Sequence, residues 1–282
     1  MESFQSWWQT IPYRIDPTIF SLGSFQVKYY GLMYILAFTT VYLLLNHRIK
    51  KEKLNYDKEL IENYFFTVIL FVLVGGRLGY VLFYNLNYFL HNPLEIFLPF
   101  KFEGGFRFTG IAGMSYHGGT LSAFIGTYIF TKKNKLNFFE FTDFIIPAVP
   151  LGYTFGRMGN FINGELYGRV TGSWFGMFFP MAGDDTLRHA SQLYEAFFEG
   201  IFLFFILWFI RKNEFVKGRL LALYLIFYGI IRFMIEYVRE PDEQLGFILF
   251  NLSMGQILCF IMILSGIVMI MINNLEKHKL KA

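Results

Sequence analysis

Seven long apolar stretches constrain the fold of this chain more than any other feature of its sequence. They lie at residues 29–45, 60–84, 111–130, 139–161, 191–210, 220–238 and 253–272. A transmembrane helix needs about 20 mostly apolar residues, and each stretch is close to that length. Hydrophobic residues make up 55% of the chain, above the roughly 45–50% of an average soluble domain. We therefore predict an all-α polytopic membrane protein with about seven transmembrane helices, forming one integral membrane domain over residues 1–282.

Basic side chains are distributed unevenly over the connecting segments. Fifteen of the 25 Lys and Arg residues fall in segments 48–58, 132–135, 211–219 and 277–281, whereas the alternate segments hold seven. Cytoplasmic loops of membrane proteins carry such an excess of Lys and Arg. The pattern predicts an N-terminus outside, a C-terminus in the cytoplasm, and outer-face segments at 85–110 and 162–190. Within these segments, the Gly- and Phe-rich residues 104–110 and 172–183 indicate short strands or turns.

The end of the fourth stretch carries an unusual concentration of polar residues. Residues 156–168 read Gly-Arg-Met-Gly-Asn-Phe-Ile-Asn-Gly-Glu-Leu-Tyr-Gly, in a chain of which 16% is charged. Ionisable side chains at membrane depth cost a few kcal/mol or more each, and they occur where they pair or bind a polar ligand. Arg157, Asn160, Asn163 and Glu165 therefore indicate a buried polar site. There are two alternative interpretations. In one, Arg157 snorkels, which means that it lies at the helix end and extends its charged group to the membrane surface. In the other, Asn160 and Asn163 cap the end of the helix.

A second polar group lies on the sixth stretch. Arg232, Glu236 and Arg239 are spaced i, i+4, i+7, which predicts one polar stripe on a helix. One interpretation is an ion pair that locks helices together. The other is a guanidinium, oriented by Glu236, that binds a phosphate through two parallel hydrogen bonds.

Two histidines and one further arginine complete the candidates. His117 is followed by two glycines, so its ring is approachable, and a neutral imidazole is a natural proton acceptor near pH 7. A structural role for this histidine is the alternative. His189 and Ser191 open the fifth stretch, where Ser191 is a candidate helix cap and Glu195 is favoured by the helix dipole. Arg77 is either functional or a partner for another buried charge.

All of these residues fall near the outer ends of the predicted helices, so we expect a site at the outer leaflet. An enzyme acting at one face fits this distribution. The alternative is a lipid or organic-anion transporter, which predicts polar residues that continue to the cytoplasmic side. The inner halves of the stretches hold little beyond Asp143. One cysteine, Cys259, and five scattered histidines lead us to expect no metal site and no cofactor.

The motifs, taken in order, resemble the prolipoprotein diacylglyceryl transferases of bacterial inner membranes. The most specific match is residues 156–168. Supporting matches, in chain order, are Tyr30-Gly31-Leu32-Met33-Tyr34, Gly75-Gly76-Arg77-Leu78-Gly79-Tyr80, His117-Gly118-Gly119, His189 with Ser191-Gln192-Leu193-Tyr194-Glu195, and Arg232-Phe233 through Glu236 to Arg239-Glu240-Pro241-Asp242. One departure is Ala190, where the family commonly has proline.

This resemblance implies an activity and its partners. The family transfers the diacylglyceryl group of phosphatidylglycerol to the cysteine thiol of a prolipoprotein lipobox, which forms a thioether and releases glycerol phosphate. The expected partners are phosphatidylglycerol, the lipobox of the prolipoprotein signal peptide and membrane lipids, without nucleic acid and with a monomer favoured. The expected location is the bacterial inner membrane, with the site toward the outer leaflet.

The resemblance also implies roles for individual residues. His117 is the expected base or thiol-orienting group, with Glu165 or Glu236 as the alternative base. Arg157 and Arg232 would hold the phosphate, and Glu236 and Glu165 would orient them or share the proton transfer. The expected headgroup contacts are Tyr30, Asn160 and Asn163, with Gly168 permitting a close turn. Secondary candidates are Arg77, His189 and Arg239.

Overall fold

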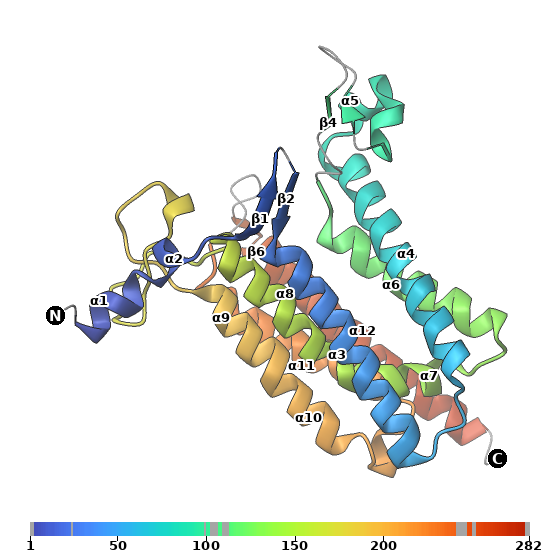
Figure 1. The fold of residues 1–282 in the computed structure, drawn as a ribbon. Helices are drawn as coiled ribbons and strands as arrows, with labels where there is room; N and C mark the ends of the chain where they lie inside the picture. The colour runs from blue at the N-terminus through green and yellow to red at the C-terminus, as the bar shows by residue number, and fades with distance from the viewer. Residues whose placement is uncertain are drawn as a thin grey trace. The chain divides into compact units, whose positions relative to one another are not determined.

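The computed structural model describes residues 3–23, 25–98, 100–101, 107–108, 113–240, 247–249 and 252–279. The chain divides into two compact units (Figure 1). The first unit comprises Met1–Arg48 with Thr142–Ala282, and the second unit comprises Ile49–Phe141. The single integral domain expected from the sequence stays a prediction, as do the outer positions of segments 85–110 and 162–190.

Helices occupy each of the seven apolar stretches. Five stretches hold continuous helices, which are α3 (Tyr29–Glu52), α4 (Lys58–Tyr84), α6 (Tyr116–Lys133), α11 (Leu220–Ile235) and α12 (Met254–Lys279). Among the described residues, four helices are long and apolar enough to cross a membrane, at Tyr29–Glu52, Lys58–Tyr84, Ser191–Ile210 and Met254–Asn274. The mostly helical, multi-pass character is thereby supported, whereas seven crossings and the orientation of the termini stay predictions. Residues 111–112 of the third stretch lie outside the described residues.

The fourth stretch is interrupted at its prolines. It consists of α7 (Phe138–Ile145), a 3₁₀ turn η2 (Ile146–Ala148) and α8 (Val149–Asn163). Pro147 and Pro150 stand at the starts of η2 and α8, where a helix tolerates a residue without an N–H group. The buried Arg48 donates from Nη1 to the carbonyl oxygens of Asp143 and Phe144, at 3.0 and 2.5 Å. These contacts satisfy carbonyls that the interruption frees.

The carboxylate of Asp143 has a structural role on the neighbouring segment. It accepts hydrogen bonds from the backbone N–H groups of Gly218 and Leu220, the latter at 2.9 Å. Leu220 is the first residue of α11, whose first N–H groups lack partners within the helix. Asp143, which the sequence places in the inner half of the fourth stretch, therefore caps a helix.

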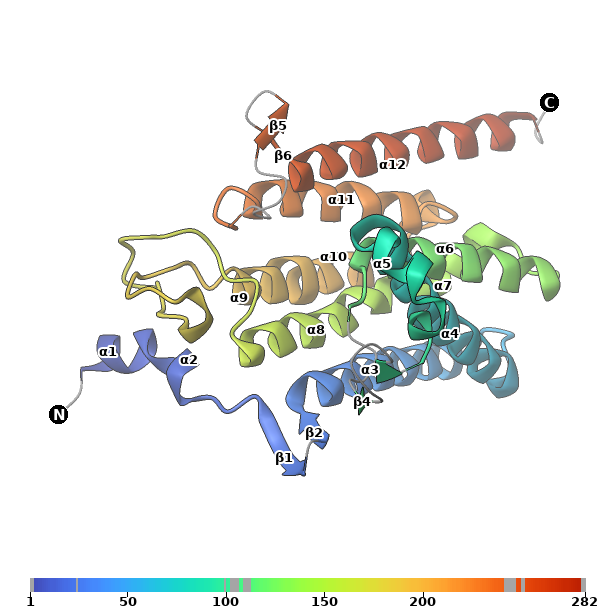
Figure 2. The same ribbon diagram turned by 90° about the horizontal axis from the view of Figure 1, so that it is seen from above.

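The fifth stretch widens into a π-helical segment. It comprises α9 (Ser191–Glu195), the π segment η4 (Ala196–Phe202) and α10 (Leu203–Ile210). Thr154 of α8 donates from Oγ1 to the carbonyl oxygen of Ala196 at 3.2 Å. A Cβ on Gly200 would lie 2.0 Å from the same Oγ1, so this contact requires glycine. Figure 2 shows the helices of the first unit side by side, in the order α12, α11, α10, α8 and α3.

The second unit is built on the contact between α4 and α6. A Cβ on Gly118 would lie 2.4 Å from the carbonyl oxygen of Gly75, and one on Gly79 would lie 2.8 Å from Cα of Gly118. These glycines therefore let the two backbones approach closely. The remaining elements of this unit are α5 (Leu86–His91), η1 (Pro93–Ile96), β3 (Phe100–Lys101) and β4 (Arg107–Phe108).

The other segments of the first unit contain short elements. β1 (Thr18–Leu22) and β2 (Phe25–Lys28) form an antiparallel hairpin that the sequence analysis missed. α1 (Phe4–Gln9) and α2 (Ile11–Arg14) precede it, and Trp8 Nε1 donates to the carbonyl oxygen of Phe175 at 3.1 Å. Residues 172–183 form turns with η3 (Pro180–Ala182), as predicted. Of the predicted 104–110 segment, residues 104–106 and 109–110 lie outside the described residues. Near the C-terminus are η5 (Glu214–Val216), β5 (Phe247–Leu249) and β6 (Leu252–Ser253).

Candidate active site

Five charged side chains from the fourth, fifth and sixth apolar stretches are buried together in the first unit. We name them the polar cluster: Arg157 of α8, Glu195 of α9, Glu199 of η4, Arg232 of α11, and Glu236 directly after α11. Both Glu195 and Glu199 have an exposed fraction of 0%, and that of Arg157 is 9%. Charges buried to this extent require partners, because desolvation of an unpaired charge costs several kcal/mol.

Glu195 joins the two arginines of the polar cluster. Its Oε2 lies 2.7 Å from Nε of Arg157 and 2.9 Å from Nη1 of Arg232. The two arginines belong to helices that are far apart in the sequence, and one carboxylate oxygen draws both guanidinium groups to the same place. Arg157 is therefore buried and paired, and the snorkelling interpretation is wrong.

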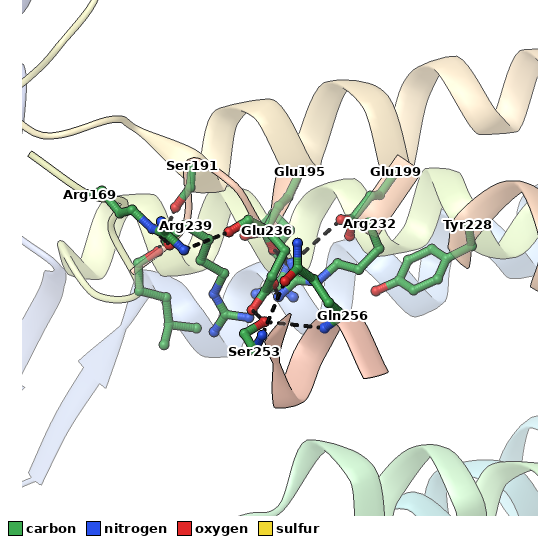
Figure 3. Close-up of polar contacts among 12 residues, drawn as sticks. Arg169, Ser191, Glu195, Glu199, Tyr228, Arg232, Glu236, Arg239, Ser253 and Gln256 are labelled. Carbon is green, nitrogen blue, oxygen red and sulfur yellow. Dashed lines mark hydrogen bonds and ion pairs between the residues drawn. The ribbon is translucent and has the colours of Figure 1, made fainter. Parts of the chain in front are cut away.

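Glu199 and Tyr153 close this arrangement into a ring. Glu199 Oε1 lies 3.5 Å from Nη1 of Arg232 (Figure 3). The Oε2 of Glu199 accepts a short hydrogen bond from the hydroxyl of Tyr153. That hydroxyl in turn accepts from Nε of Arg157 at 2.6 Å. The ring runs through the residues in the order Arg157, Glu195, Arg232, Glu199 and Tyr153.

A line of amide and carboxylate contacts leads from Arg157 along the end of α8. Arg157 Nη1 donates to Oδ1 of Asn160 at 3.3 Å. The Nδ2 groups of Asn160 and Asn163 both donate to Oε1 of Glu165, at 2.8 and 3.3 Å. The helix ends at Gly164, whose φ is +69° and whose N–H bonds the carbonyl oxygen of Phe161. The asparagine side chains thus bind a carboxylate, and the capping interpretation is wrong.

Gly168 lies where three backbone segments meet. Its N–H donates to the carbonyl oxygen of His189 at 2.7 Å. A Cβ on Gly168 would lie 2.4 Å from the carbonyl oxygen of Val238 and 2.8 Å from Cβ of His189. The next residue, Arg169, donates from Nε to the carbonyl oxygen of Arg239 at 2.8 Å. The absence of a side chain at Gly168 therefore allows residues 156–168, which we name the signature segment, to approach the chain beyond α11.

The predicted stripe on the sixth stretch is correct for its first two members and wrong for the third. Glu236 Oε2 lies 3.0 Å from Nη2 of Arg232, which confirms the i, i+4 ion pair. α11 ends at Ile235, however, and Arg239 lies beyond the helix, paired through its backbone with Gly168. The i+7 position does not continue the helix face because the chain has turned away to make this pairing.

Glu236 is also held from the following helix. Its Oε1 accepts from Oγ of Ser253 at 3.0 Å, and Ser253 also accepts from the backbone N–H of Gln256 at 3.2 Å. A Cβ on Gly255 would lie 2.5 Å from Oε1 of Glu236. The start of α12 therefore fixes the carboxylate that pairs with Arg232.

Tyr30 and His189 lie beside this arrangement. A Cβ on Gly159 would lie 3.0 Å from ring atom Cδ2 of Tyr30, which places this ring against α8 next to Asn160. His189 Nδ1 lies 3.3 Å from the hydroxyl of Tyr194, and burial lowers the pKa of His189. Ser191 donates to the carbonyl oxygen of Leu166 at 3.0 Å instead of capping α9.

Comparison with known proteins shows the family to which this chain belongs. Residues 17–272 match the family described as prolipoprotein diacylglyceryl transferase. This chain belongs to that family. It is 54% identical over 268 residues to the phosphatidylglycerol--prolipoprotein diacylglyceryl transferase of Chlorobaculum tepidum, covering 95% of this chain and 93% of that protein. It is 43% identical to the protein of the same name from Ehrlichia ruminantium (strain Welgevonden), covering 94% and 99%. The identity to that of Campylobacter lari is 41%, covering 96% and 98%.

Most of the residues singled out from the resemblance to the transferases lie in the first unit. They are Tyr30, Arg157, Asn160, Asn163, Glu165, Gly168, His189, Arg232, Glu236 and Arg239. His117 and Arg77 belong to the second unit. His117 is exposed in the first turn of α6, and its role as a base stays a prediction.

Arg77 has a set of partners that differs from that of the arginines in the polar cluster. Its Nε and Nη2 donate to the carbonyl oxygens of Ile96 and Glu95, both at 2.6 Å, and its Nη1 donates to that of Gly113 at 3.2 Å. Its guanidinium also lies 4.8 Å from the centre of the Phe89 ring. These contacts tie Glu95, Ile96 and Gly113 to α4.

Sequence reasoning missed Tyr153 and Glu199, and it gave Glu195 only a role at the start of a helix. The missed signal is the pair Glu195 and Glu199, four residues apart within an apolar stretch. Such a spacing puts both carboxylates on one side of a helix, and carboxylates at membrane depth indicate a functional site. Tyr153 carries no comparable signal, because tyrosine is common in this chain.

The arrangement is suited to bind a phosphate. The contacts of Arg157 within the described residues use Nε and Nη1, so Nη2 is left for a bound anion. Glu195 and the hydroxyl of Tyr153 hold the guanidinium of Arg157 in a fixed orientation. Three carboxylates, those of Glu195, Glu199 and Glu236, hold that of Arg232. Arginine binds phosphate through two parallel hydrogen bonds more effectively than lysine does, and it does so best when its orientation is fixed in advance.

Proposed function

We propose that the polar cluster binds the phosphate of phosphatidylglycerol and that diacylglyceryl transfer takes place beside it. The chain is a transferase of the prolipoprotein diacylglyceryl transferase family, and its relatives are named for phosphatidylglycerol and prolipoprotein. These names favour the enzyme over the transporter. In the reaction, the diacylglyceryl group passes to the lipobox cysteine of a prolipoprotein.

The chemistry is a displacement at carbon. The sulfur of the cysteine forms a bond to the terminal glycerol carbon of the diacylglyceryl group, and the bond from that carbon to the phosphate oxygen breaks with its electron pair. The thiol proton leaves with a base, and glycerol phosphate is released. A free thiol has a pKa of about 8.5, so the reaction near neutral pH needs a base and a site that stabilises the departing phosphate.

Each part of the site has a role in this proposal. Arg157 and Arg232 hold the phosphate, while Glu195 and Glu236 keep their guanidinium groups oriented. Further headgroup contacts come from Tyr30, Asn160 and Asn163. His117 takes the thiol proton, with Glu165 or Glu236 as the alternative.

The observation that carries the proposal is the position of Glu195 between the two arginines. A carboxylate that only neutralised one charge would need one partner. Here two guanidinium groups from different helices converge, which places two positive charges within reach of a single phosphate. We further propose a monomer in the bacterial inner membrane, with this site toward the outer leaflet, where a lipid headgroup is within reach.

The test is incubation of the purified protein with phosphatidylglycerol and a lipobox peptide, followed by mass spectrometry of the peptide. The expected result is a gain of one diacylglyceryl group on the cysteine. A peptide with serine in place of that cysteine is the matched control and should stay unmodified. An unchanged cysteine peptide, in the presence of folded protein, would contradict the proposed function.

A further inference from the structure

Glu199 has two partners that belong to different helices. It is fully buried, accepts from the hydroxyl of Tyr153 on α8, and lies 3.5 Å from Nη1 of Arg232 on α11. Thr154, the residue after Tyr153, bonds the carbonyl oxygen of Ala196 at 3.2 Å and contacts Gly200. Both the side chain of Glu199 and the neighbouring backbone of η4 are therefore held against α8.

Tyr153 connects this carboxylate to the other arginine. Its hydroxyl accepts from Nε of Arg157 at 2.6 Å, and its single proton is donated to Glu199. Its ring also lies beneath the same guanidinium, 4.9 Å from Cζ to the ring centre. Without Tyr153 or Glu199, the two arginines would be joined through Glu195 alone. Their other contacts, Asn160 for Arg157 and Glu236 for Arg232, do not link one guanidinium to the other.

We propose that Tyr153 and Glu199 are a positioning pair, which fixes the separation and orientation of Arg157 and Arg232 for the phosphate. This inference rests on the proposed function of the polar cluster. The pair itself does not touch the lipid. Tyr153 gives Nε of Arg157 a second acceptor, and Glu199 gives Nη1 of Arg232 a second acceptor, beside those from Glu195. The guanidinium groups thereby present their remaining N–H groups together. A displacement of about 1 Å at a reacting centre can lower the rate about 10²-fold. Loss of the positioning pair should have an effect of this size.

Three single variants separate position from charge. Tyr153→Phe removes the hydroxyl and keeps the ring. Glu199→Gln keeps the length of the side chain and removes the charge, whereas Glu199→Asp keeps the charge and shortens the reach by one methylene. If position matters, Glu199→Asp should be impaired although its charge is retained.

The matched control is Tyr88→Phe in the second unit. Tyr88 also donates its hydroxyl to a buried carboxylate, Oε2 of Glu95, at 2.5 Å. This variant loses the same type of hydrogen bond outside the polar cluster, and we expect its turnover to equal that of the wild type. It therefore reports the effect of deleting a buried Tyr–Glu bond as such.

The experiment measures kcat and KM for phosphatidylglycerol and KM for the lipobox peptide in each full-length variant. We expect Tyr153→Phe and Glu199→Asp to lower kcat/KM for the lipid by about 10- to 100-fold, with KM for the peptide unchanged. Because both residues act through the same ring, the double variant Tyr153→Phe/Glu199→Gln should lose no more than about the larger single loss.

The outcomes are distinct from those of the proposed function. If the wild type transfers no diacylglyceryl group, the proposed function fails. If the wild type is active and Tyr153→Phe matches it, the positioning pair is wrong. Losses that multiply in the double variant, or that raise KM for the peptide equally, would show a general structural role and also overturn the inference.

Discussion

Arg77 and Arg157 stand in similar sequence surroundings, yet the structure gives them different kinds of partner. Gly76-Arg77-Leu78-Gly79 and Gly156-Arg157-Met158-Gly159 share their glycines. Arg77 donates to three backbone carbonyls of its own unit. Arg157 is held by side chains, namely a carboxylate, a tyrosine hydroxyl and an amide.

The two arginines differ in how many guanidinium nitrogens their partners leave for a ligand. Backbone carbonyls engage all three nitrogens of Arg77 and fix a segment of chain. Within the described part of the chain, the partners of Arg157 contact Nε and Nη1, which leaves Nη2 for a ligand. A buried arginine is thus a candidate ligand-binding residue when its partners are side chains shared with a second arginine, and an architectural one when its partners are local carbonyls.

His117→Gln has the largest expected effect and is the sharpest challenge to this comparison, because His117 belongs to the same unit as Arg77. If its imidazole takes the thiol proton, the rate of the chemical step should fall by about 10²–10⁴-fold. The loss should shrink as pH rises, because the free cysteine ionises near a pKa of about 8.5. Single-turnover rates over a pH series test this expectation. A defect that is constant with pH would transfer the base role to Glu165 or Glu236.

Arg157→Lys and Arg77→Lys make the same chemical change in the two surroundings. Arg157→Lys should lower kcat by about 10²–10³-fold, the scale for losing a donor to developing negative charge, because an ammonium cannot reproduce the guanidinium fork. Arg77→Lys should act mainly on the midpoint of thermal unfolding. Turnover and unfolding are measured on both variants, and equal losses of turnover would remove the distinction between the two arginines.

Gly168→Ala tests the close approach of the signature segment to the chain after α11. The new methyl group would lie 2.4 Å from the carbonyl oxygen of Val238, and such overpacking typically costs about 1–3 kcal/mol. Gly172→Ala is the matched control, since a Cβ there meets nothing within 4 Å. Denaturant unfolding should separate the two variants. Equal free energies of unfolding for the two variants would show that the backbone around residue 168 shifts without cost, and would contradict a required close approach.

Cys259→Ala has the smallest expected effect. The nucleophile of the proposed reaction belongs to the substrate, and Cys259 is a buried residue of α12. Transfer rates should match those of the wild type. A large loss with normal folding would indicate a covalent intermediate on the enzyme and would overturn the mechanism.

Much of the helical architecture follows from the sequence, because apolar stretches of spanning length and proline positions are local signals. The interruption at Pro147 and the pairing of Arg232 with Glu236 are of this kind. The β1–β2 hairpin was missed because it is short and its apolar side chains are largely exposed, among them Leu22 at 76%.

The composition of the polar cluster was only partly predictable. Arg157, Arg232 and Glu236 stand out as charges within apolar stretches. The contacts of Glu195, Glu199 and Tyr153 depend on which helices become neighbours, and no local pattern reports this. The end of α11 at Ile235 is likewise set by the distant backbone of Gly168, with which Arg239 pairs.

The most direct test of the central claim is the binding of phosphatidylglycerol without any peptide. Lipid retention is measured by native mass spectrometry for the wild type, Arg157→Lys, Arg232→Lys and Arg77→Lys. Loss of a hydrogen bond to a charged group costs about 1.5–3 kcal/mol, or about 10- to 100-fold in affinity. We expect that loss for Arg157→Lys and Arg232→Lys, and wild-type retention for the folded fraction of Arg77→Lys. Unchanged retention in both polar-cluster variants would contradict the assignment of Arg157 and Arg232 to the phosphate.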